Sequence, residues 1–503
     1  MFEVREVDLA GRIGRLYTKS GTIETPAFFP VIDVARQEVN LEEVRDVGFN
    51  QIITNAYLLL KRYGEKVAEE GIHRFLGWDG VVMTDSGAYQ ILQYGEVAAT
   101  QEEIIDYQVR IGSDISVILD IPTGDVDRAS AERSVRITLE RARRAVEHIR
   151  DTPNLWVLPV QGGRFLDLVE MSAREASRLE GYSVYAVGSP TVFLERYKYR
   201  TVLKIASVAR RNLPLGKPVH LFGAGHPLII PYAVALGMDL FDSASYILYA
   251  RDGRVFTDYG VERLERLHYL PCTCPHCAKR SPQELLEMPS RERTRILALH
   301  NLCMIKKYLD ETKQAIKEGR LWELLEAVSR HHPSAYESFH TVAENLDLIL
   351  KVSPRLRGVI RGVRGYSVES LSNPKLYYYR SKILEMRYKP KVSPHSRVIL
   401  APYPSSIEEC SPPRLSRDPY VIYYHPLLGV VPMELCGVFP TIHVHWPSET
   451  PGGSMLSRMV EDVVSYTRRL IEDLKVEILV DARDPWGVRD RIRKGIVAGS
   501  GGS

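Results

Sequence analysis

The sequence contains no apolar stretch long enough to cross a bilayer and no recognisable signal peptide. A membrane-spanning helix needs about 20 mostly apolar residues, and a signal peptide joins a basic region to an apolar one. Residues Met1 to Ala10 instead alternate acidic and basic side chains. These absences argue against a membrane or secreted protein and predict a cytoplasmic location.

Cysteine and net charge are also scarce. The chain of 503 residues has six cysteines, of which three crowd into one short segment, and a formal net charge of only +3. Secreted disulfide scaffolds are small and dense in cysteine, so this distribution supports a reducing compartment. The charged fraction of 26% is typical of globular proteins, and the length allows a sizeable core and more than one domain.

What the sequence does contain is a series of apolar runs, each ending in a polar residue or glycine and followed by a helical pattern. Nearly continuous apolar strands that alternate with helices predict a parallel sheet covered on both faces. Eight such runs fit a (β/α)8 TIM barrel. The runs are Thr25 to Asp33, Gln51 to Asn55, Val81 to Asp85, Ile115 to Asp120, Leu155 to Gln161, Val184 to Gly188, Val219 to Gly225 and Asp239 to Asp242.

Polar residues and glycine end most of these runs. In a barrel of this kind, catalytic residues come from the carboxyl ends of several strands. Independent helix caps are the alternative, since Asp and Asn favour that position, but caps would not favour a glutamine followed by Gly162-Gly163. We therefore expect one shared site built from Asn55, Asp85, Asp120, Gln161, Gly188 and Asp242.

Two of these carboxylates lie in distinctive motifs. Asp85 lies in Thr-Asp-Ser-Gly-Ala-Tyr-Gln, and Asp242 lies in Phe-Asp-Ser-Ala-Ser-Tyr. A pair of carboxylates can supply a nucleophile and an acid/base partner for substitution at a sugar C1 carbon. The sequence does not order the two roles.

A Cys-x-Cys-x-x-Cys run supplies three neighbouring thiols, Cys272, Cys274 and Cys277. Three thiolates this close can share one tetrahedral Zn²⁺ with a fourth ligand from elsewhere in the chain. We expect that ligand to be His300, on a predicted helix from Arg291 to Asp310, and a site with four protein ligands is structural. A reduced or disulfide-forming loop is the other interpretation. The alternative fourth ligands are His268 and His276.

The stretch from Lys351 to Lys391 is basic, and only Glu369 and Glu385 oppose its charge. Basic side chains neutralise phosphates and aromatic ones stack on unpaired bases. A solvated surface is the plainer explanation, but the local excess is strong for a chain with a net charge of +3. We predict that this region contacts RNA. Its tyrosines are Tyr366, Tyr377, Tyr378, Tyr379 and Tyr388.

Beyond Pro394 the pattern becomes α/β again. Three runs read as strands, and apolar residues spaced three and four apart from Leu456 to Leu474 mark one face of a long helix. The predicted organisation is a barrel at 1–340 with a zinc-binding insertion at about 265–305, a basic and aromatic RNA-contacting region at 341–395, a smaller α/β domain at 396–490 and a flexible tail at 491–503. The two smaller parts together are expected to be of the α+β class.

In these motifs and their order, the chain resembles the archaeal tRNA-guanine transglycosylase family. The resemblance covers the barrel, the zinc segment and much of the C-terminal half. It implies a base exchange in archaeosine biosynthesis, in which guanine 15 of the tRNA D-arm is replaced by 7-cyano-7-deazaguanine (preQ0) through a covalent ribosyl-enzyme intermediate. The other motifs that carry it are Leu119-Asp120-Ile121-Pro122, Val160-Gln161-Gly162-Gly163, His220-Leu221-Phe222-Gly223-Ala224-Gly225 and the cysteine run followed by His300-Asn301-Leu302.

The resemblance also implies site roles. Asp242 would be the nucleophile and Asp85 the acid/base, although the reverse assignment also exists in this family. A guanine-like edge offers two N–H donors and a carbonyl oxygen, which a carboxylate and an amide can bind. The base-binding residues would be Asp120 for the donors, Gln161 and the Gly188 backbone for the carbonyl, and Tyr89 and Phe222 as stacking platforms, for which core packing is the alternative.

Two other functions fit the same architecture. An archaeosine synthase-like paralogue tends to lack the barrel carboxylates, and a noncatalytic tRNA-binding subunit would not need them. A bacterial-type enzyme acting on the anticodon is disfavoured by Gly188-Ser189-Pro190 and the long C-terminal half. The implied partners are tRNA, guanine, preQ0 and a second copy in a homodimer. Family members commonly end in a PUA domain, for which the tail leaves no room, so a separate PUA-domain polypeptide could supply it.

Overall fold

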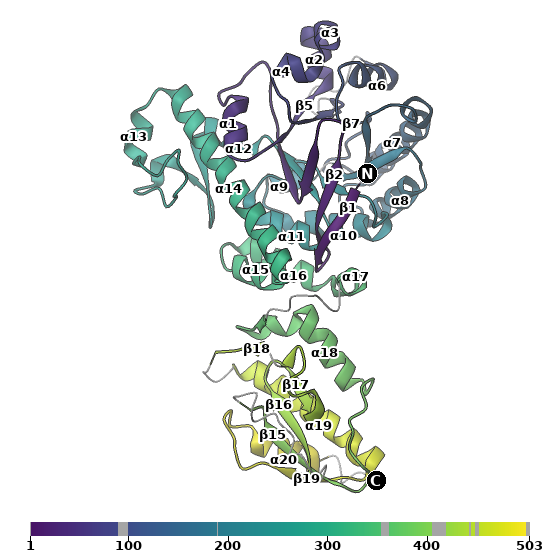
Figure 1. Cartoon of the computed structure of the whole chain (residues 1–503), viewed down its shortest axis with the longest axis vertical. Helices are drawn as coiled ribbons and strands as arrows, with labels where there is room; N and C mark the ends of the chain where they lie inside the picture. The colour runs from purple at the N-terminus through teal and green to yellow at the C-terminus, as the bar shows by residue number, and fades with distance from the viewer. Residues whose placement is uncertain are drawn as a thin grey trace. The chain divides into compact units, whose positions relative to one another are not determined.

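The protein divides into two compact units, residues 1–354 and residues 355–503 (Figure 1). The structure is a computed structural model that describes residues 2–88, 99–188, 190–353, 362–404, 419–441, 444–447 and 452–498. Among these described residues, no helix combines the length and the apolarity that a membrane crossing requires.

The first unit is the predicted (β/α)8 barrel. Its eight strands are parallel and are ordered β4-β11-β10-β9-β8-β7-β6-β5. A single bridge between Val31 and Ile53 joins β4 to β5, and the Ile32 N–H donates to the Ile53 carbonyl over 2.8 Å, which closes the ring. The strands are β4 (Ala27–Pro30), β5 (Gln51–Asn55), β6 (Val81–Asp85), β7 (Ile115–Val117), β8 (Leu155–Val160), β9 (Tyr182–Val187), β10 (Val219–Leu221) and β11 (Leu240–Ser243).

Several strands are shorter than their apolar runs predicted. Strand β7 ends at Val117, whereas the run continues to Asp120, because the backbone leaves the sheet before it reaches the rim. The strands are nonetheless buried on both faces, as expected for a sheet with side chains packed inside the barrel and helices packed outside it.

An antiparallel sheet covers one end of the barrel. It consists of β1 (Phe2–Asp8), β2 (Gly11–Tyr17) and β3 (Thr22–Thr25). The loop between β2 and β3 lies at the amino ends of the barrel strands, because the Ser20 N–H donates to Asp114 just before β7. Leu16 and Ile23 join the apolar interior of the barrel there. The carboxyl end, where polar residues were predicted to gather, is therefore the end available to a substrate.

Helices surround the barrel, and the longest of them is α14 (Figure 1). The helices of this unit are α1 (Leu41–Asp46), α2 (Ala56–Tyr63), α3 (Lys66–Glu70), α4 (Ile72–Leu76), α6 (Gln101–Arg110), α7 (Arg128–Ile149), α8 (Leu166–Ser177), α9 (Thr191–Leu194), α10 (Tyr199–Asn212), α11 (Ile230–Ala235), α12 (Ser245–Arg251), α13 (Pro282–Glu287), α14 (Ser290–Glu318), α15 (Leu321–Val328), α16 (Pro333–Ala343) and α17 (Leu346–Val352). A hairpin of β12 (Arg254–Thr257) and β13 (Gly260–Arg263) follows α12.

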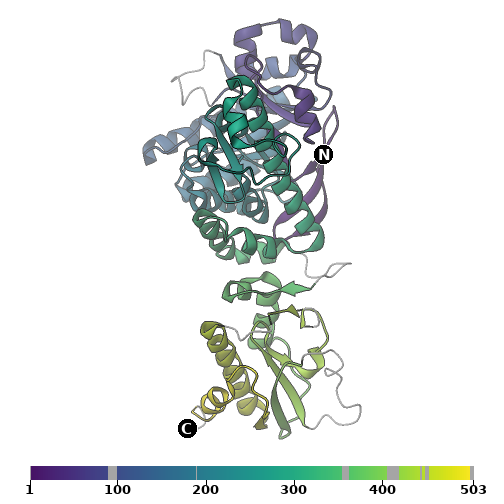
Figure 2. The same cartoon turned by 90° about the vertical axis from the view of Figure 1, so that its left-hand side faces the viewer.

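The second unit is a smaller mixed α+β domain with its own apolar core. Its main sheet has the order β17-β16-β15-β19, in which β15 is parallel to both neighbours and β17 is antiparallel. Helices α19 and α20, olive and yellow in Figure 2, lie on one face of this sheet. Its elements are β14 (Val363–Arg364), α18 (Pro374–Leu384), β15 (Arg397–Pro402), β16 (Tyr420–His425), β17 (Gly429–Pro432), β18 (Val444–His445), α19 (Gly453–Leu474), β19 (Glu477–Val480) and α20 (Arg489–Val497).

Two features of this unit differ from the sequence analysis. Helix α20 occupies residues assigned to the flexible tail, because its Ile492 is buried in the core of the unit. Cys436 is disulfide-bonded, a bond that the sequence analysis did not predict.

The basic and aromatic stretch is not uniformly exposed. Tyr366 and Tyr377 are exposed, but Tyr379 is buried and its hydroxyl donates to the Val430 carbonyl over 3.0 Å. Arg380 is also buried, where it forms an ion pair with Asp462 on α19. These last residues hold the unit together, so the surface available to a polyanion is smaller than the composition of the stretch suggests.

Candidate active site and metal centre

A cavity of about 400 Å³ opens at the carboxyl end of the barrel. Most of the polar residues predicted to share a site line it, because parallel strands end at one rim. Gln161 lies behind this lining and is 1% exposed. Tyr89 lies outside the described residues. The predicted residues that line the cavity are Asn55, Asp85, Asp120, Gly188, Phe222 and Asp242.

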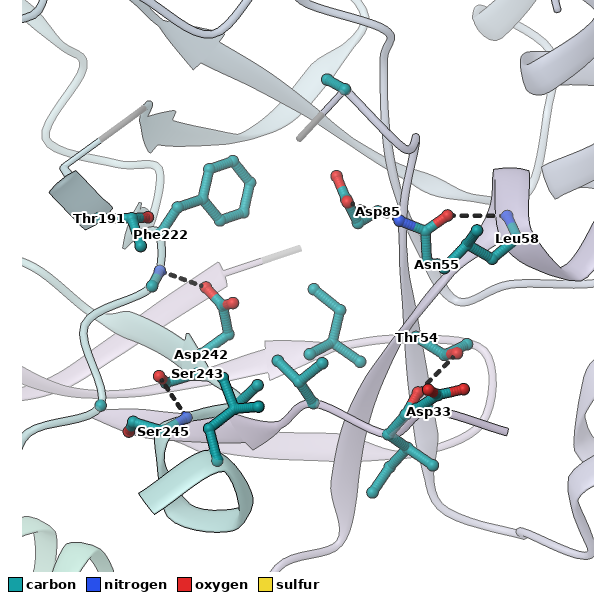
Figure 3. A pocket seen from close by; sticks show the side chains of 18 of the residues that line it. Asp33, Thr54, Asn55, Leu58, Asp85, Thr191, Phe222, Asp242, Ser243 and Ser245 are labelled. Carbon is teal, nitrogen blue, oxygen red and sulfur yellow. Dashed lines mark hydrogen bonds between the residues drawn. The ribbon is translucent and has the colours of Figure 1, made fainter. Parts of the chain in front are cut away.

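Asp85, the last residue of β6, lies across the cavity from Asp242 (Figure 3). Asn55, the last residue of β5, donates from Nδ2 to Asp85 Oδ2 over 3.2 Å. The Asn55 Oδ1 in turn accepts the Leu58 N–H at the start of α2, which fixes the amide. The pKa of Asp85 is raised to about 7, mainly by burial and in addition by the nearby charges of Asp120 and Asp242, against backbone hydrogen bonds that lower it. Asp85 is therefore suited to hold a proton at neutral pH and to release it.

Asp120 and Gln161 form a buried pair. The Gln161 Nε2 donates to Asp120 Oδ2, and the Gln161 Oε1 accepts the Thr123 N–H and hydroxyl, each over 3.0 Å. Burial raises the pKa of Asp120 to about 6, and the hydrogen bond from Gln161 acts in the opposite direction. Gln161 thus holds the orientation of Asp120 at the cavity wall.

Asp242 is held by two donors on one oxygen. His220 Nε2 lies 2.9 Å from Asp242 Oδ1, and the Gly223 N–H donates to the same oxygen over 3.0 Å. Gly223 has a φ of +72°, and a Cβ there would lie 2.7 Å from the Thr191 hydroxyl, so this tight approach requires glycine. The second carboxylate oxygen has no hydrogen-bond partner among the described residues.

The remaining predicted residues shape the cavity. The Phe222 ring lies on the same side as Asp242 (Figure 3). A Cβ on Gly188 would lie 2.2 Å from Gln161 Nε2, so the wall there is bare backbone. The Gly188 N–H donates to the Val160 carbonyl over 2.9 Å, and is therefore engaged within the sheet.

Sequence reasoning gave no role to two residues that contact the carboxylates, Asn55 and His220. Asn55 was placed at the rim, and only the observed hydrogen bond links it to Asp85. His220 lies two residues before Phe222, in one of the motifs that carry the family resemblance. The sequence did offer a signal for His220: it is a polar residue in an otherwise apolar strand. A buried polar side chain needs a hydrogen-bond partner, so such a residue predicts a polar neighbour.

Cys272, Cys274, Cys277 and His300 come together as predicted, with their ligand atoms within 4.8 Å of one another. Cys277 Sγ lies 3.3 Å from His300 Nδ1. The other ring nitrogen of His300, Nε2, is 2.8 Å from the Phe256 carbonyl, which can only accept, so Nδ1 carries the lone pair that a metal needs. Three sulfurs and one imidazole nitrogen form a set that could hold a metal ion.

Together, the closed barrel, the carboxyl groups on facing sides of its cavity and the aromatic ring beside them define a barrel enzyme equipped for substitution at a sugar carbon.

Comparison with known proteins gives the family. The family model described as queuine tRNA-ribosyltransferase matches residues 8–334. The tRNA-guanine(15) transglycosylase of Aeropyrum pernix is 54% identical over 468 residues, which cover 92% of this chain and 91% of that one. The protein of the same name from Saccharolobus solfataricus is 44% identical over 483 residues, 93% and 95% of the two chains. The chain belongs to the tRNA-guanine transglycosylase family.

Proposed function

We propose that this protein exchanges guanine 15 of the tRNA D-arm for preQ0 in archaeosine biosynthesis. Membership of the tRNA-guanine transglycosylase family supports the reaction class, and the names of the relatives support the position in the tRNA. The observation that carries the chemistry is the pair of carboxyl groups facing each other across the cavity, Asp85 and Asp242 (Figure 3).

Asp242 is the proposed nucleophile. Its Oδ2 attacks C1′ of the target nucleotide, and the bond from C1′ to the guanine nitrogen breaks with its electron pair passing to the base. Two donors on Oδ1 stabilise the carboxylate charge and leave Oδ2 for attack. The product of this step is a ribosyl ester of Asp242.

Asp85 is the proposed acid and base. Because its pKa is raised to about 7, the carboxyl group can give its proton to the departing guanine. The resulting carboxylate then takes a proton from the ring nitrogen of preQ0, which attacks C1′ and releases the Asp242 carboxylate. Two displacements on one carbon retain its configuration.

Asp120 is the proposed receptor of the base. Above its pKa of about 6, the carboxylate accepts the paired N–H donors of a guanine-like edge. Gln161 orients it from behind the lining, and the bare backbone at Gly188 lies on the carbonyl side of the base in this proposal. Phe222 supplies the stacking that an extruded base loses in the RNA, and Tyr89 is the proposed second platform.

Incorporation of labelled guanine and preQ0 into tRNA transcripts tests the reaction, with a transcript changed at nucleotide 15 as the substrate control. We expect Asp242→Asn to abolish exchange and the covalent adduct seen on denaturing gels, and Asp85→Asn to slow exchange while tRNA still binds. Asp33→Asn is the matched control, because Asp33 lines the same cavity but pairs with Arg62.

An adduct that survives in Asp242→Asn and is lost in Asp85→Asn would reverse the roles of the two carboxyl groups. Intact tRNA binding without any incorporation would favour a noncatalytic subunit.

We also propose that Cys272, Cys274, Cys277 and His300 hold one structural Zn²⁺ per chain. Cys274→Ala should lose the metal and lower the melting temperature together, since binding to a closed site contributes to folding. His268→Ala is the matched control, because His268 is an exposed alternative ligand outside the cluster of four. Metal analysis that finds no zinc in freshly purified protein would contradict this assignment.

The proposed setting is a cytoplasmic homodimer that binds tRNA, with a PUA-domain polypeptide as a separate partner. Sedimentation with and without tRNA tests the dimer, and co-purification tests the partner. The proposed division of labour follows the sequence prediction: the barrel at 1–340 performs the chemistry, and the region after it provides tRNA affinity.

A further inference from the structure

His220 is a polar side chain in an apolar layer. It lies in the middle of β10 and is fully buried. Its ring stacks on Phe29 from β4 at 6.0 Å and lies 4.6 Å from the ring of Phe222. Phe29 belongs to the apolar cluster that fills the barrel interior, so His220 also faces inward.

The pairing of β10 with β11 places His220 close to Asp242. His220 is in register with Leu240. Asp242 lies two residues further along β11 and therefore on the same face of the sheet. The His220 ring spans this offset, so that its Nε2 lies 2.9 Å from Asp242 Oδ1.

The proton of His220 can be assigned from its partner. An ionised carboxylate only accepts hydrogen bonds, so Nε2 must carry the proton of this interaction. The other ring nitrogen, Nδ1, is buried without a hydrogen-bond partner among the described residues. A buried nitrogen left unpaired costs free energy, whereas an apolar side chain in this layer would cost none. Packing alone therefore does not account for a histidine here, and its contact with Asp242 does.

We propose that His220 is a positioning residue for Asp242, an inference that rests on the proposed role of Asp242 as nucleophile. The His220 N–H and the Gly223 N–H fix Oδ1 from two sides. This arrangement turns Oδ2 toward the sugar. His220 transfers no proton: it donates to the carboxylate before attack, to the carbonyl oxygen of the ester in the intermediate, and to the carboxylate again as the C1′–O bond breaks.

Substitution of His220 separates this role from packing. His220→Phe keeps the ring and removes the donor, and we expect kcat to fall by about 100-fold, as for a misplaced reacting group. The KM values for tRNA and for the base should stay within about 2-fold of the native values, because no proposed binding contact changes. His220→Gln places an N–H near the position of Nε2 and should recover most of the rate and of the covalent adduct.

Tyr232→Phe is the matched control for the loss of one buried hydrogen bond. Its hydroxyl donates to the Leu325 carbonyl over 3.0 Å, between α11 and α15 and outside the cavity lining. This variant should lose stability and keep its kcat. Equal rates in His220→Phe and the native protein would overturn the inference, and so would equal losses in His220→Phe and His220→Gln, or failure of both variants to fold.

Asp242→Asn, assayed in parallel, separates the proposed role of Asp242 from that of His220. If that variant still forms the adduct, the proposed nucleophile is wrong. If it forms none while His220→Phe reacts at the native rate, only the role of His220 fails.

Discussion

The barrel cavity and the C-terminal unit both bury charged groups, but they arrange them in opposite ways. Asp85, Asp120 and Asp242 lie in one cavity, and burial together with the charges of the other two raises the pKa of Asp85 to about 7. The C-terminal unit buries Arg380 against Asp462, with the Arg380 Nη1 donating also to the Leu427 carbonyl over 3.1 Å. Like charges share the first site, and opposite charges share the second.

The difference separates chemistry from architecture. Burial raises the pKa of Asp462 and lowers that of Arg380, but each partner's charge opposes the shift of the other. In the cavity, no described cation is hydrogen-bonded to the carboxyl oxygens of Asp85, Asp120 or Asp242. A group whose pKa is moved toward neutrality without a compensating partner is suited to proton transfer, whereas a paired group is suited to hold two helices together.

The largest effect is expected from the C-terminal pair. Arg380→Ala leaves the buried Asp462 with Arg458, at 3.5 Å, as its one cationic partner among the described residues, and should lower the free energy of unfolding of this unit by about 3–5 kcal/mol. The double variant Arg380→Met/Asp462→Leu removes both charges and should be close to native stability. Urea unfolding followed by tryptophan fluorescence measures both. Equal losses in the single and double variants would mean that the pair itself stabilises the unit.

The pH profile is the corresponding test of the cavity. The proposed acid form of Asp85 is lost as pH rises through its pKa of about 7. At saturating tRNA and base, kcat should therefore fall by about tenfold per pH unit well above this value. Asp85→Glu keeps a carboxyl group and should retain a falling limb at a shifted pH. A kcat that stays constant from pH 6 to pH 9 would assign the acid role to another group.

Much of the cavity can be predicted from the sequence because parallel strands bring their last residues to one rim. That rule alone groups Asn55, Asp85, Asp120 and Asp242 in one site. The cysteine cluster is predictable for a local reason, since three of its four residues lie within a segment of six. The first feature follows from the order of the strands, and the second from the spacing of the cysteines.

The features that cannot be predicted in this way depend on packing between distant segments. The contact of His220 with Asp242 requires the register of β10 with β11. Arg380 looked like part of a basic surface, and its burial depends on which face of α18 meets α19. Gln161 was expected to reach the base, but its amide is engaged with Asp120 and Thr123. Composition cannot distinguish a charge that faces water from one that faces a partner.

A smaller effect should appear in the stability of the barrel. Asp85 binds a proton more tightly in the folded state than in the unfolded chain, where its pKa is near the ordinary value. As pH rises from about 4 to about 7, burial of Asp85 therefore lowers the free energy of unfolding more and more. Above that range the whole of this destabilisation is present. At pH 8, Asp85→Asn should raise the free energy of unfolding by roughly 1–2 kcal/mol, less than the whole shift because the cavity admits water. At pH 4 the variant and the native protein should have nearly the same free energy of unfolding. Equal stability of the two proteins at both pH values would contradict the raised pKa.

The smallest effect per residue is expected on the exposed part of the basic stretch. Arg364, Lys389 and Lys391 are exposed, unlike Arg380, so their side chains can reach phosphates from the surface. Replacing the three with alanine should weaken tRNA binding and reduce the slope of log affinity against log salt by about one per lost phosphate contact. Saturating tRNA should restore kcat, because none of the three lines the cavity.

The control variant removes the same charge from the barrel surface by replacing three exposed arginines of α7, which are Arg133, Arg136 and Arg144. Equal changes in the salt slope for the two triple variants would mean that tRNA responds to net charge alone, and an unchanged slope in the first would make the stretch an ordinary solvated surface.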